Sequence, residues 1–345
     1  MESLKIPNEK GYNIWAKANA WGVEMKTVSI ILACKNEQET LPIYFKAVDP
    51  IIKSIKDYAF DFIMVNDGST DNTAKVMNDI YEKRNDVTII SFSKNFGQNP
   101  GIFAAFKQNK SDYVITMDCD LQDPVSLIKD ICDKFTEGYE IVNPHRGDRK
   151  NDSWLKRTTA GMFYKVINKL EKKEAIPSNV NAYRGLSKRA VDEINKMSET
   201  DRLFMPTIPL VGFKSCEVDY VRGKRVAGKT NFNTDKLVTY ALDNISVATS
   251  RPLFLASKFG VITSIIFFLS SLALLICYIL GLCQVMPAYS AITVFMIISF
   301  VFLAASVVIT FVGINGLYEH NILINTRNRP MYVIDYIRTQ QDKQK

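Results

Sequence analysis

The chain has 345 residues and a formal net charge of +7, which is enough length for one large domain with an appendage. It contains two histidines and six cysteines without a CxxC pair, so its composition argues against a zinc site and favours cysteines that act as small apolar residues. Positive charge suits work beside an anionic leaflet, although ordinary solubility explains it equally well.

The N-terminal residues 1–25 are predicted to be an extension outside the folded domain. They lack the apolar stretch of a signal peptide and precede the first strand-like run. The string from Trp21 to Met25 back-translates to a G-rich stretch before an ATG, which resembles a bacterial ribosome-binding site. Met25 is therefore a second candidate for the first residue.

From residue 27 onward, short apolar runs alternate with helical segments. The predicted strands are 27–34, 60–65, 87–92 and 113–117, and the predicted helices are 40–56, 72–84, 101–108 and 124–137. A helix at 154–172 and strands at 183–187 and 214–221 follow. This alternation predicts an α/β domain with a mostly parallel, Rossmann-like sheet and helices on both faces.

Acidic motifs fall where two of the predicted strands end. Asp67 closes the second strand and Asp118 closes the fourth, and ligands of such sheets bind beyond the carboxyl ends of the strands. Asp118 and Asp120 are spaced to converge on one divalent cation, and Mg²⁺ and Mn²⁺ prefer oxygen ligands. Near Asp67, Gly68 permits a tight turn, and a carboxylate there can accept hydrogen bonds from a nucleobase. A helix N-cap supplied by Ser69, Thr70 or Asp71 is the alternative function of this motif, and both can hold for different residues.

A long apolar region lies near the C-terminus, because no charged residue occurs from Phe259 to Tyr318. Its length fits two membrane spans, near 259–282 and 289–313, joined by a turn that contains Pro287. A buried hairpin of a soluble protein is the less favoured alternative. Basic residues flank the spans and are absent from the turn, which places both termini in the cytosol: Arg251, Lys258, Arg327, Arg329 and Arg338.

The segment before the first span, 233–256, has apolar residues at helical spacing. It predicts either an amphipathic helix that lies on the membrane or a helix packed on the domain. The predicted organisation is thus an extension (1–25), an α/β domain (26–232), a juxtamembrane helix (233–256), two spans (257–316) and a basic tail (317–345).

Several strings resemble the GT-A glycosyltransferases of family 2, and more narrowly the polyprenyl-phosphate glycosyltransferases. They are SIILACKNEQETLP, VNDGSTDNT, SFSKNFGQN, MDCDLQDP, PHRGDR, AYRGLSKRAVD, LVGFKSCEVDYVRGKRVAGKTNF and RNRPMYVI. The resemblance covers about residues 25–336, most of the chain. It implies an enzyme that moves a hexose or N-acetylhexosamine from a nucleoside diphosphate to a polyprenyl phosphate, with inversion, at the cytoplasmic face of the cell membrane.

The resemblance also implies roles for particular residues. Those expected to hold the nucleotide sugar are Ala33, Glu37, Asp67, Ser69 and Asp118. Those expected to hold Mg²⁺ or Mn²⁺ with the diphosphate are Asp118, Asp120 and Gln122. Those expected to bind the acceptor phosphate are Arg184, Arg222, Arg225 and Lys229, and the expected catalytic residues are Asp118, Asp120 and Arg184. General attraction to anionic lipid is an alternative role for Lys229 in particular.

The chain departs from the family pattern at Ala182, where relatives usually have an aspartate that is a candidate base. A phosphate monoester, with its second pKa of about 6, is already a dianion near neutral pH and needs no general base. The GKTNFN string, which includes Lys229, also differs from the usual GESKY-like string, and its positive charge could alter acceptor or sugar choice.

Two alternatives to this function stay open. One is transfer to another membrane-proximal acceptor, such as a diacylglycerol or a growing polysaccharide. The other is a non-catalytic, membrane-tethered binder of nucleotide sugars, which the replacement at Ala182 favours and the intact DCDLQDP string disfavours. The sequence indicates no nucleic-acid partner, is compatible with a homo-oligomer and does not identify the sugar.

Overall fold

The computed structural model describes residues 25–146, 182–197, 203–221, 290–327 and 329–343, with residues 199, 223 and 253 and parts of 258–276. The extension before residue 25, the predicted helix at 154–172, nearly all of 233–256 and all but the last residue of the predicted turn at 283–290 lie outside these residues.

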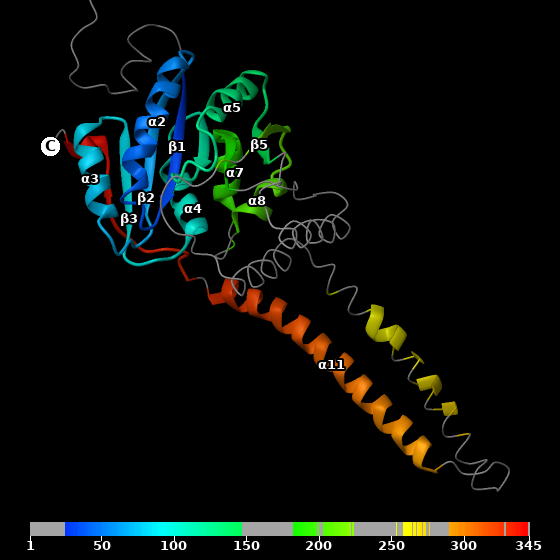
Figure 1. Cartoon of the computed structure of the whole chain (residues 1–345). Coiled ribbons are helices and arrows are strands. Elements are labelled where there is room, and N and C mark those ends of the chain that lie inside the picture. The colour runs from blue at the N-terminus through cyan, green and yellow to red at the C-terminus, as the bar shows by residue number, and fades with distance from the viewer. Residues whose placement is uncertain are drawn as a thin grey trace, which may run out of the picture.

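One sheet organises the described part of the chain, with the strand order β7-β5-β6-β4-β1-β2-β3-β8 (Figure 1). Its central strands β1 to β4 are parallel, as the alternating pattern predicts. The strands are β1 (Lys26–Cys34), β2 (Tyr58–Asn66), β3 (Val87–Phe92), β4 (Tyr113–Met117), β5 (Ile141–Arg146), β6 (Arg184–Ser187), β7 (Ser215–Tyr220) and β8 (Ile334–Arg338).

Helices cover both faces of this sheet, because successive side chains of a strand point to opposite sides. In β1, Ile30 and Leu32 join the core beneath one set of helices, while Ile31 joins the core on the other face. The first face carries α2 (Thr40–Ser54), α3 (Thr73–Lys83) and α5 (Leu127–Thr136), and the second carries α4 (Gln98–Gln108), α7 (Lys188–Lys196) and α8 (Phe204–Leu210).

The edge at which β1 to β4 end is called the carboxyl edge below. Arg184, the first residue of β6, pairs with Thr116 near the end of β4, so the antiparallel β6 begins at this edge. Since β7 runs parallel to β5 and β5 antiparallel to β6, β7 ends there at Tyr220. The antiparallel β8 also begins there, where Ile334 pairs with Phe92.

The predicted elements within the described residues are confirmed to within a few residues, including β3 and β4 at their predicted bounds. Among the described residues, five elements were not predicted: β5, α7, α8, β8 and a short 3₁₀ helix at 340–343. The strand β5 contains Pro144, which reads as a strand breaker.

The predicted basic tail 317–345 is not a separate tail. The helix α11 (Ser290–Arg327) continues past the apolar stretch and ends shortly before Pro330, which lacks the N–H that a helix interior requires. The strand β8 then joins the sheet, and the 3₁₀ helix η1 (Gln340–Lys343) lies against α3, where Lys343 donates to Tyr81 O. Thr339 accepts the hydroxyl hydrogen of Tyr81 at 2.6 Å, which fixes this end of the chain.

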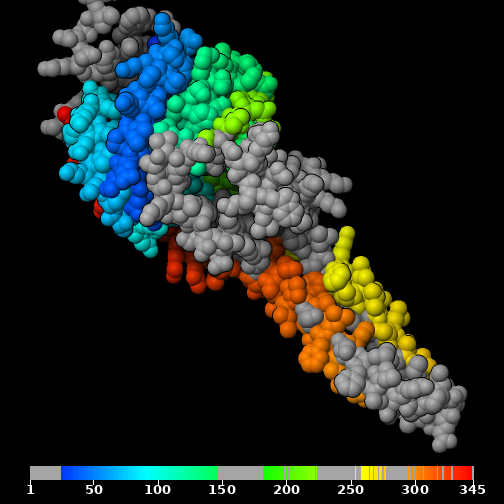
Figure 2. All heavy atoms as spheres, in the orientation of Figure 1, coloured from blue at the N-terminus to red at the C-terminus, as the bar shows by residue number. Residues whose placement is uncertain are grey.

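The helix α11 extends away from the sheet (Figure 1). Among the described residues, one helical stretch, Phe300–Arg327, is long and apolar enough to cross a membrane. A shorter apolar helix, Lys258–Ser270, runs beside α11, and Figure 2 shows the two in contact. The ring centroids of Phe259 and Phe311 lie 6.2 Å apart. This contact agrees with a predicted hairpin, although most of the first predicted span lies outside the described residues.

A half-buried aspartate lies towards the opposite ends of the strands, away from the carboxyl edge. Asp61 Oδ1 is enclosed without a hydrogen-bond partner among the described residues, and Oδ2 accepts the hydroxyl hydrogen of Ser111 at 3.4 Å. Burial raises the pKa of Asp61 from 3.8 to about 6, against the opposing effect of hydrogen bonds from Ser29 and Ser111. The folded chain therefore holds this proton more tightly than the unfolded chain does.

We expect Asp61→Asn to stabilise the protein above pH 6. Below pH 3.8 the carboxyl group is protonated in both states, and stability is lost as the pH rises towards the folded-state pKa of about 6. A rise of about 2 in pKa corresponds to about 3 kcal/mol at most. Thermal unfolding at pH 8 should show a melting temperature several degrees higher for the variant, and the gain should vanish near pH 4. An equal gain at both pH values would contradict this.

Candidate functional site

The loop after β2 is tied to the loop after β3 by the carboxylate of Asp67. Its Oδ1 accepts the N–H of Phe96 at 2.6 Å, and its Oδ2 accepts the N–H of Gly97 at 2.9 Å. The side chain is buried, and its own N–H donates to Cys34 O at 2.9 Å. Asp67 thus joins the ends of β1, β2 and β3, a structural role in addition to the predicted contact with a nucleoside.

Gly68 makes the close approach of these two loops feasible. Its φ is +56°, and a Cβ placed on it would lie 2.3 Å from the carbonyl carbon of Lys94 and 2.4 Å from the nitrogen of Asn95. No side chain fits such a gap. The glycine therefore serves both the turn and the contact between the loops.

A second set of hydrogen bonds joins the loop after β1 to the loop after β2. Asn36 Oδ1 accepts the N–H of Thr70 at 2.8 Å, while the N–H of Asn36 donates to Ser69 Oγ at 3.1 Å. The N–H of Glu37 donates to Thr73 Oγ1 at 2.8 Å. Of the residues predicted to hold the nucleotide, Ser69 and Glu37 therefore lie together at the carboxyl edge, and both also stabilise the loops.

Ala33 lies at the same edge but faces helix α4. A Cβ on Gly101 would lie 3.3 Å from the Ala33 Cβ, so the small side chains at both positions let α4 lie close to β1. The packing of α4 on the sheet is the contact that this structure gives to Ala33.

The carboxylate of Asp118 lies where β4 ends and meets the N-terminus of α4. Gln98 donates from Nε2 to Asp118 Oδ1 at 2.7 Å, and Asp118 is partly exposed. The amide therefore fixes the orientation of the carboxylate from the first residue of α4. Gln98 was not among the predicted site residues, although it belongs to the SFSKNFGQN string.

The rest of the DCDLQDP string forms a tight turn. Asp120 is buried, and its Oδ1 accepts the N–H of Gln122 at 3.0 Å, while Leu121 has the unusual φ of +56°. Asp123 accepts the hydroxyl hydrogen of Tyr220 at 2.7 Å, which ties this turn to the end of β7. Non-glycine residues rarely adopt a positive φ, so the turn is held by its surroundings.

The thiol of Cys34, beside this turn, is inert. Cys34 and Cys119 are free and buried, and the hydrogen bond to Cys119, together with burial, raises the pKa of Cys34 well above its ordinary value. A thiol that stays protonated is neither a nucleophile nor a metal ligand at neutral pH. The prediction that cysteines serve as small buried residues is confirmed for Cys34, Cys119 and Cys132.

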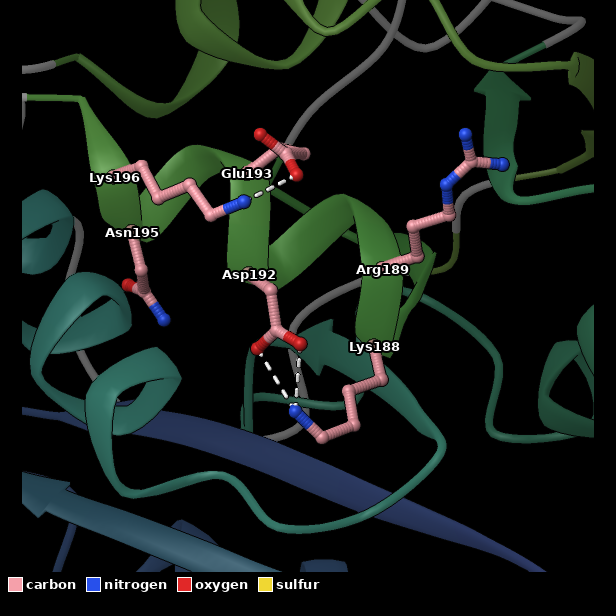
Figure 3. A pocket seen from close by; sticks show the side chains of 6 residues that line it. All are labelled: Lys188, Arg189, Asp192, Glu193, Asn195 and Lys196. Atoms are coloured by element: carbon pink, nitrogen blue, oxygen red, sulfur yellow. Dashed lines mark hydrogen bonds and ion pairs between the residues drawn. The ribbon is translucent and has the colours of Figure 1, made fainter.

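A hollow over helix α7 is remote from this edge. Figure 3 shows its charged side chains paired along the helix, Lys188 with Asp192 at 2.7 Å and Lys196 with Glu193 at 2.6 Å. The N–H of Lys188 donates to Asp112 O, just before β4 begins, and therefore at the opposite end of that strand from Asp118. These paired, solvated charges do not contribute to the site at the carboxyl edge.

Comparison with known proteins identifies the family of a chain that has this sheet and these acidic turns. The family described as glycosyl transferase family 2 matches residues 29–194. The prophage bactoprenol glucosyl transferase homolog of Escherichia coli (strain K12) is 33% identical over 312 residues, which are 90% of this chain and 99% of that protein. The chain belongs to glycosyl transferase family 2.

Two further similarities span much of this family 2 glycosyltransferase. The uncharacterized glycosyltransferase YkoT of Bacillus subtilis (strain 168) is 35% identical over 318 residues, covering 89% of this chain and 91% of that protein. The glucosyl-3-phosphoglycerate synthase of Mycobacterium tuberculosis has a TM-score of 0.48 at 17% identity, covering 71% of this chain and 84% of that one. The family model and the bactoprenol glucosyl transferase relatives confirm the resemblance read from the motifs and the enzyme class.

The oxygen atoms of Asp118 and Asp120 fit a hard divalent cation. Within the described residues there is no group of three or more histidine, cysteine, aspartate or glutamate side chains that could hold a metal. Mg²⁺, however, is commonly bound by one or two carboxylates, with substrate phosphates and water completing its shell. Asp118 is partly exposed at the strand end, so the residues suit a metal that arrives with a diphosphate.

The predicted phosphate-binding residues divide into two groups. Arg184 is fully buried, with its guanidinium 5.8 Å from the ring centroid of Phe204 in α8. It lies at the carboxyl edge but presents no exposed surface to an acceptor. Arg222, Arg225 and Lys229 lie outside the described residues. Gly223 is described, and its N–H donates to Gln122 O at 2.8 Å, so the chain passes directly beside the DCDLQDP turn at this residue.

Proposed function

We propose that this glycosyltransferase moves a sugar from a nucleoside diphosphate, most simply a UDP-hexose or UDP-N-acetylhexosamine, to a polyprenyl phosphate in the membrane. One observation carries the proposal. The chain leaves the sheet at the end of β7 and returns at the start of β8, both at the carboxyl edge, where Asp67 and Asp118 lie. The apolar helix α11 ends at Arg327, only a few residues before β8. A lipid acceptor and a nucleotide donor would therefore meet at one edge of the domain.

The donor would bind across the ends of β1, β2 and β4. The loops joined by Asp67 would receive the nucleoside, and Asp118 and Asp120 would hold a divalent cation with the diphosphate. A bound Mg²⁺ or Mn²⁺ would offset negative charge on the leaving diphosphate. Gln98 would keep the Asp118 carboxylate in one orientation through the 2.7 Å hydrogen bond, so that the site is preorganised for this charge.

The acceptor step needs no proton transfer. An oxygen of the lipid phosphate would form a bond to the anomeric carbon on the face opposite to the diphosphate. The bond between that carbon and the diphosphate oxygen would break, and the nucleoside diphosphate would leave with the electron pair. Because a phosphate monoester is largely dianionic near pH 7, Ala182 is compatible with activity although it provides no base.

The topology of the sheet supports a membrane hairpin. Strands β7 and β8 belong to one sheet, so a chain that crosses a membrane between them must cross it an even number of times. If α11 is one crossing, a second must lie between residues 221 and 289, as the sequence pattern predicts. The basic residues on either side of the apolar region support a cytosolic position for the sheet.

Bactoprenol transferases among the relatives favour a polyprenyl phosphate acceptor over the alternatives. A diacylglycerol acceptor would carry a hydroxyl group, which needs a base that Ala182 does not provide. A non-catalytic binder would have no need for two carboxylates beside an oriented glutamine. The acceptor is therefore the point that an experiment must settle.

The test uses the purified full-length chain in detergent with Mn²⁺ and a panel of UDP-sugars. Each sugar is offered undecaprenyl phosphate, undecaprenol or diacylglycerol. The proposal expects release of UDP and formation of a lipid-linked sugar with the phosphate alone. Transfer to diacylglycerol would replace the proposal with the rival acceptor, and nucleotide binding without turnover on any acceptor would favour the binder.

Arg222→Ala and Arg225→Ala are expected to weaken use of the lipid phosphate by about ten- to a hundredfold. Arginine can hold a phosphate through two parallel hydrogen bonds, a geometry that lysine cannot reproduce. The expected range corresponds to the net loss of one charge-assisted hydrogen bond, worth roughly 1.5–3 kcal/mol. Initial rates against undecaprenyl phosphate should show a higher KM or a lower kcat, with partial rescue by lysine and nearly unchanged UDP affinity.

Two results would reassign these arginines. Full rescue by lysine, with added salt imitating the alanine variants, would indicate general attraction to the membrane. Weakened UDP affinity with unchanged acceptor kinetics would assign the residues to the donor diphosphate. The contact between Gly223 and Gln122 makes this second result the sharper rival.

A further inference from the structure

We infer that Tyr332, in the segment that returns from helix α11, is a positioning residue for the donor site. It would hold the loop 93–97, which carries the two N–H groups bound by Asp67, through contacts that run from its own ring to Phe92 and from Phe92 to Phe96. The inference rests on the proposed donor site, because that site gives the loop its function.

The first step is the contact between Tyr332 and the catalytic sheet. Its ring stacks on that of Phe92, the last residue of β3, with centroids 5.1 Å apart and an interplanar angle of 13°. Lys107 of α4 places its ammonium group 5.8 Å from the centroid of the Tyr332 ring. The next residue, Val333, accepts the N–H of Ser93 at 3.1 Å. The returning segment therefore contacts both the end of β3 and the first residue of the loop.

The second step runs from Phe92 to Asp67. The rings of Phe92 and Phe96 meet edge to face, with centroids 5.7 Å apart and an interplanar angle of 87°. The backbone N–H of that same Phe96 donates to Asp67 Oδ1 at 2.6 Å. Edge-to-face and offset stacked rings are favourable arrangements with defined geometry. Phe96 is thus held on one side by the rings and on the other by the carboxylate.

The third step explains why the loop depends on this support. Gly97, whose N–H also donates to Asp67, has a φ of +104°, a backbone conformation that L side chains rarely adopt. No helix or strand includes residues 93–97. The loop is therefore held by Asp67, by the Val333 carbonyl and by the packing of Phe96. Two of these three supports depend on residues that follow α11. Val333 provides the carbonyl, and Tyr332 packs on Phe92, which in turn packs on Phe96.

The strand β8 provides a matched control. Tyr336 is four residues beyond Tyr332, is likewise partly buried, and packs into the core on the opposite face of the sheet. Replacing either tyrosine with alanine removes the same aromatic ring from the segment that follows α11. Of the two tyrosines, Tyr332 is the one that stacks on Phe92, whose ring contacts Phe96. A general weakening of β8 would affect both variants, whereas positioning of the loop would separate them.

The experiment compares Tyr332→Ala, Tyr332→Phe and Tyr336→Ala in the full-length chain in detergent. The first measurement is amide hydrogen exchange of residues 93–97. The second is the affinity for UDP with Mn²⁺, measured by calorimetry. Tyr332→Ala should exchange these amides about tenfold faster and bind UDP about tenfold more weakly, as expected for loss of a packed ring pair. Tyr332→Phe should resemble the wild type, and Tyr336→Ala should retain both protection and UDP affinity.

Two results would overturn the inference. One is unchanged exchange of residues 93–97 in Tyr332→Ala, and the other is an equal loss of protection in Tyr336→Ala, which would indicate a merely structural strand. If the wild-type chain itself fails to bind UDP, the proposed uridine donor is wrong, and the exchange measurement alone then decides the role of Tyr332.

Discussion

Replacing Asp118 with Asn is expected to lower the rate of glycosyl transfer by about a thousandfold while the fold stays intact. The side chain lies partly exposed at the end of β4, and an asparagine there can still accept the hydrogen bond from Gln98. The substitution therefore removes a negative charge from the proposed metal site with little change of shape. Loss of one preorganised group that stabilises developing charge costs roughly a hundredfold to a thousandfold in rate.

The measurements for this variant are transfer rate, Mn²⁺ dependence and thermal unfolding, with Asp120→Asn and Gln98→Ala alongside. Asp120→Asn should lower the rate of transfer to a similar extent, and burial of this side chain makes its fold control more important. Gln98→Ala retains both carboxylates and should lose only part of the activity. Normal activity of either aspartate variant in EDTA-treated, metal-free buffer would exclude the metal role.

Gly68→Ala is expected to have the second large effect, on the nucleotide site itself. The added Cβ would lie 2.3 Å from a backbone carbon of Lys94, so the loops joined by Asp67 must separate. Both oxygen atoms of Asp67 would then lose backbone N–H donors, and hydrogen bonds to charged groups are worth roughly 1.5–3 kcal/mol each. We expect UDP affinity to fall by about a hundredfold or more, with a clear decrease in melting temperature.

The chain offers a matched control for this glycine. Gly212 has a similar φ of +64°, but a Cβ on it would meet nothing within 4 Å. Gly212→Ala should therefore show only the cost of a left-handed backbone, about 1–2 kcal/mol of stability, with UDP affinity preserved. If Gly68→Ala behaved like Gly212→Ala, the close approach of the two loops would not be needed for nucleotide binding.

The central fold could be predicted because its signals are local. The strands β1 to β4 are short apolar runs, each followed by a polar turn, and the acidic residues Asp67 and Asp118 directly follow β2 and β4 at the carboxyl edge. The sequence motifs also predicted the family. The positions of these turns follow from the alternation of strands and helices, which requires no knowledge of distant contacts.

The remaining features depend on contacts between distant parts of the chain. Phe96 and Gly97, whose N–H groups donate to Asp67, lie about thirty positions further along the chain. The sequence therefore suggested a nucleobase contact for Asp67 but not its joining of two loops. The strand β8 is five residues long, follows a long apolar helix and contains Asp335 and Arg338, so it resembled a basic tail. Its pairing with β3 becomes visible only when the sheet is assembled.

The late position of β8 also sets an order for biosynthesis. The ribosome makes β3 long before it makes β8, and the apolar helix α11 emerges between them. Until β8 has been synthesised and pairs with it, β3 is an outer strand with one side unpaired. Incomplete chains associate through such unpaired strands. The last strand of the catalytic sheet can be added only after the apolar helix has been synthesised. A chain that stops before residue 334 thus has every acidic motif but an incomplete sheet, which makes the unfinished protein a natural target for chaperones and proteases.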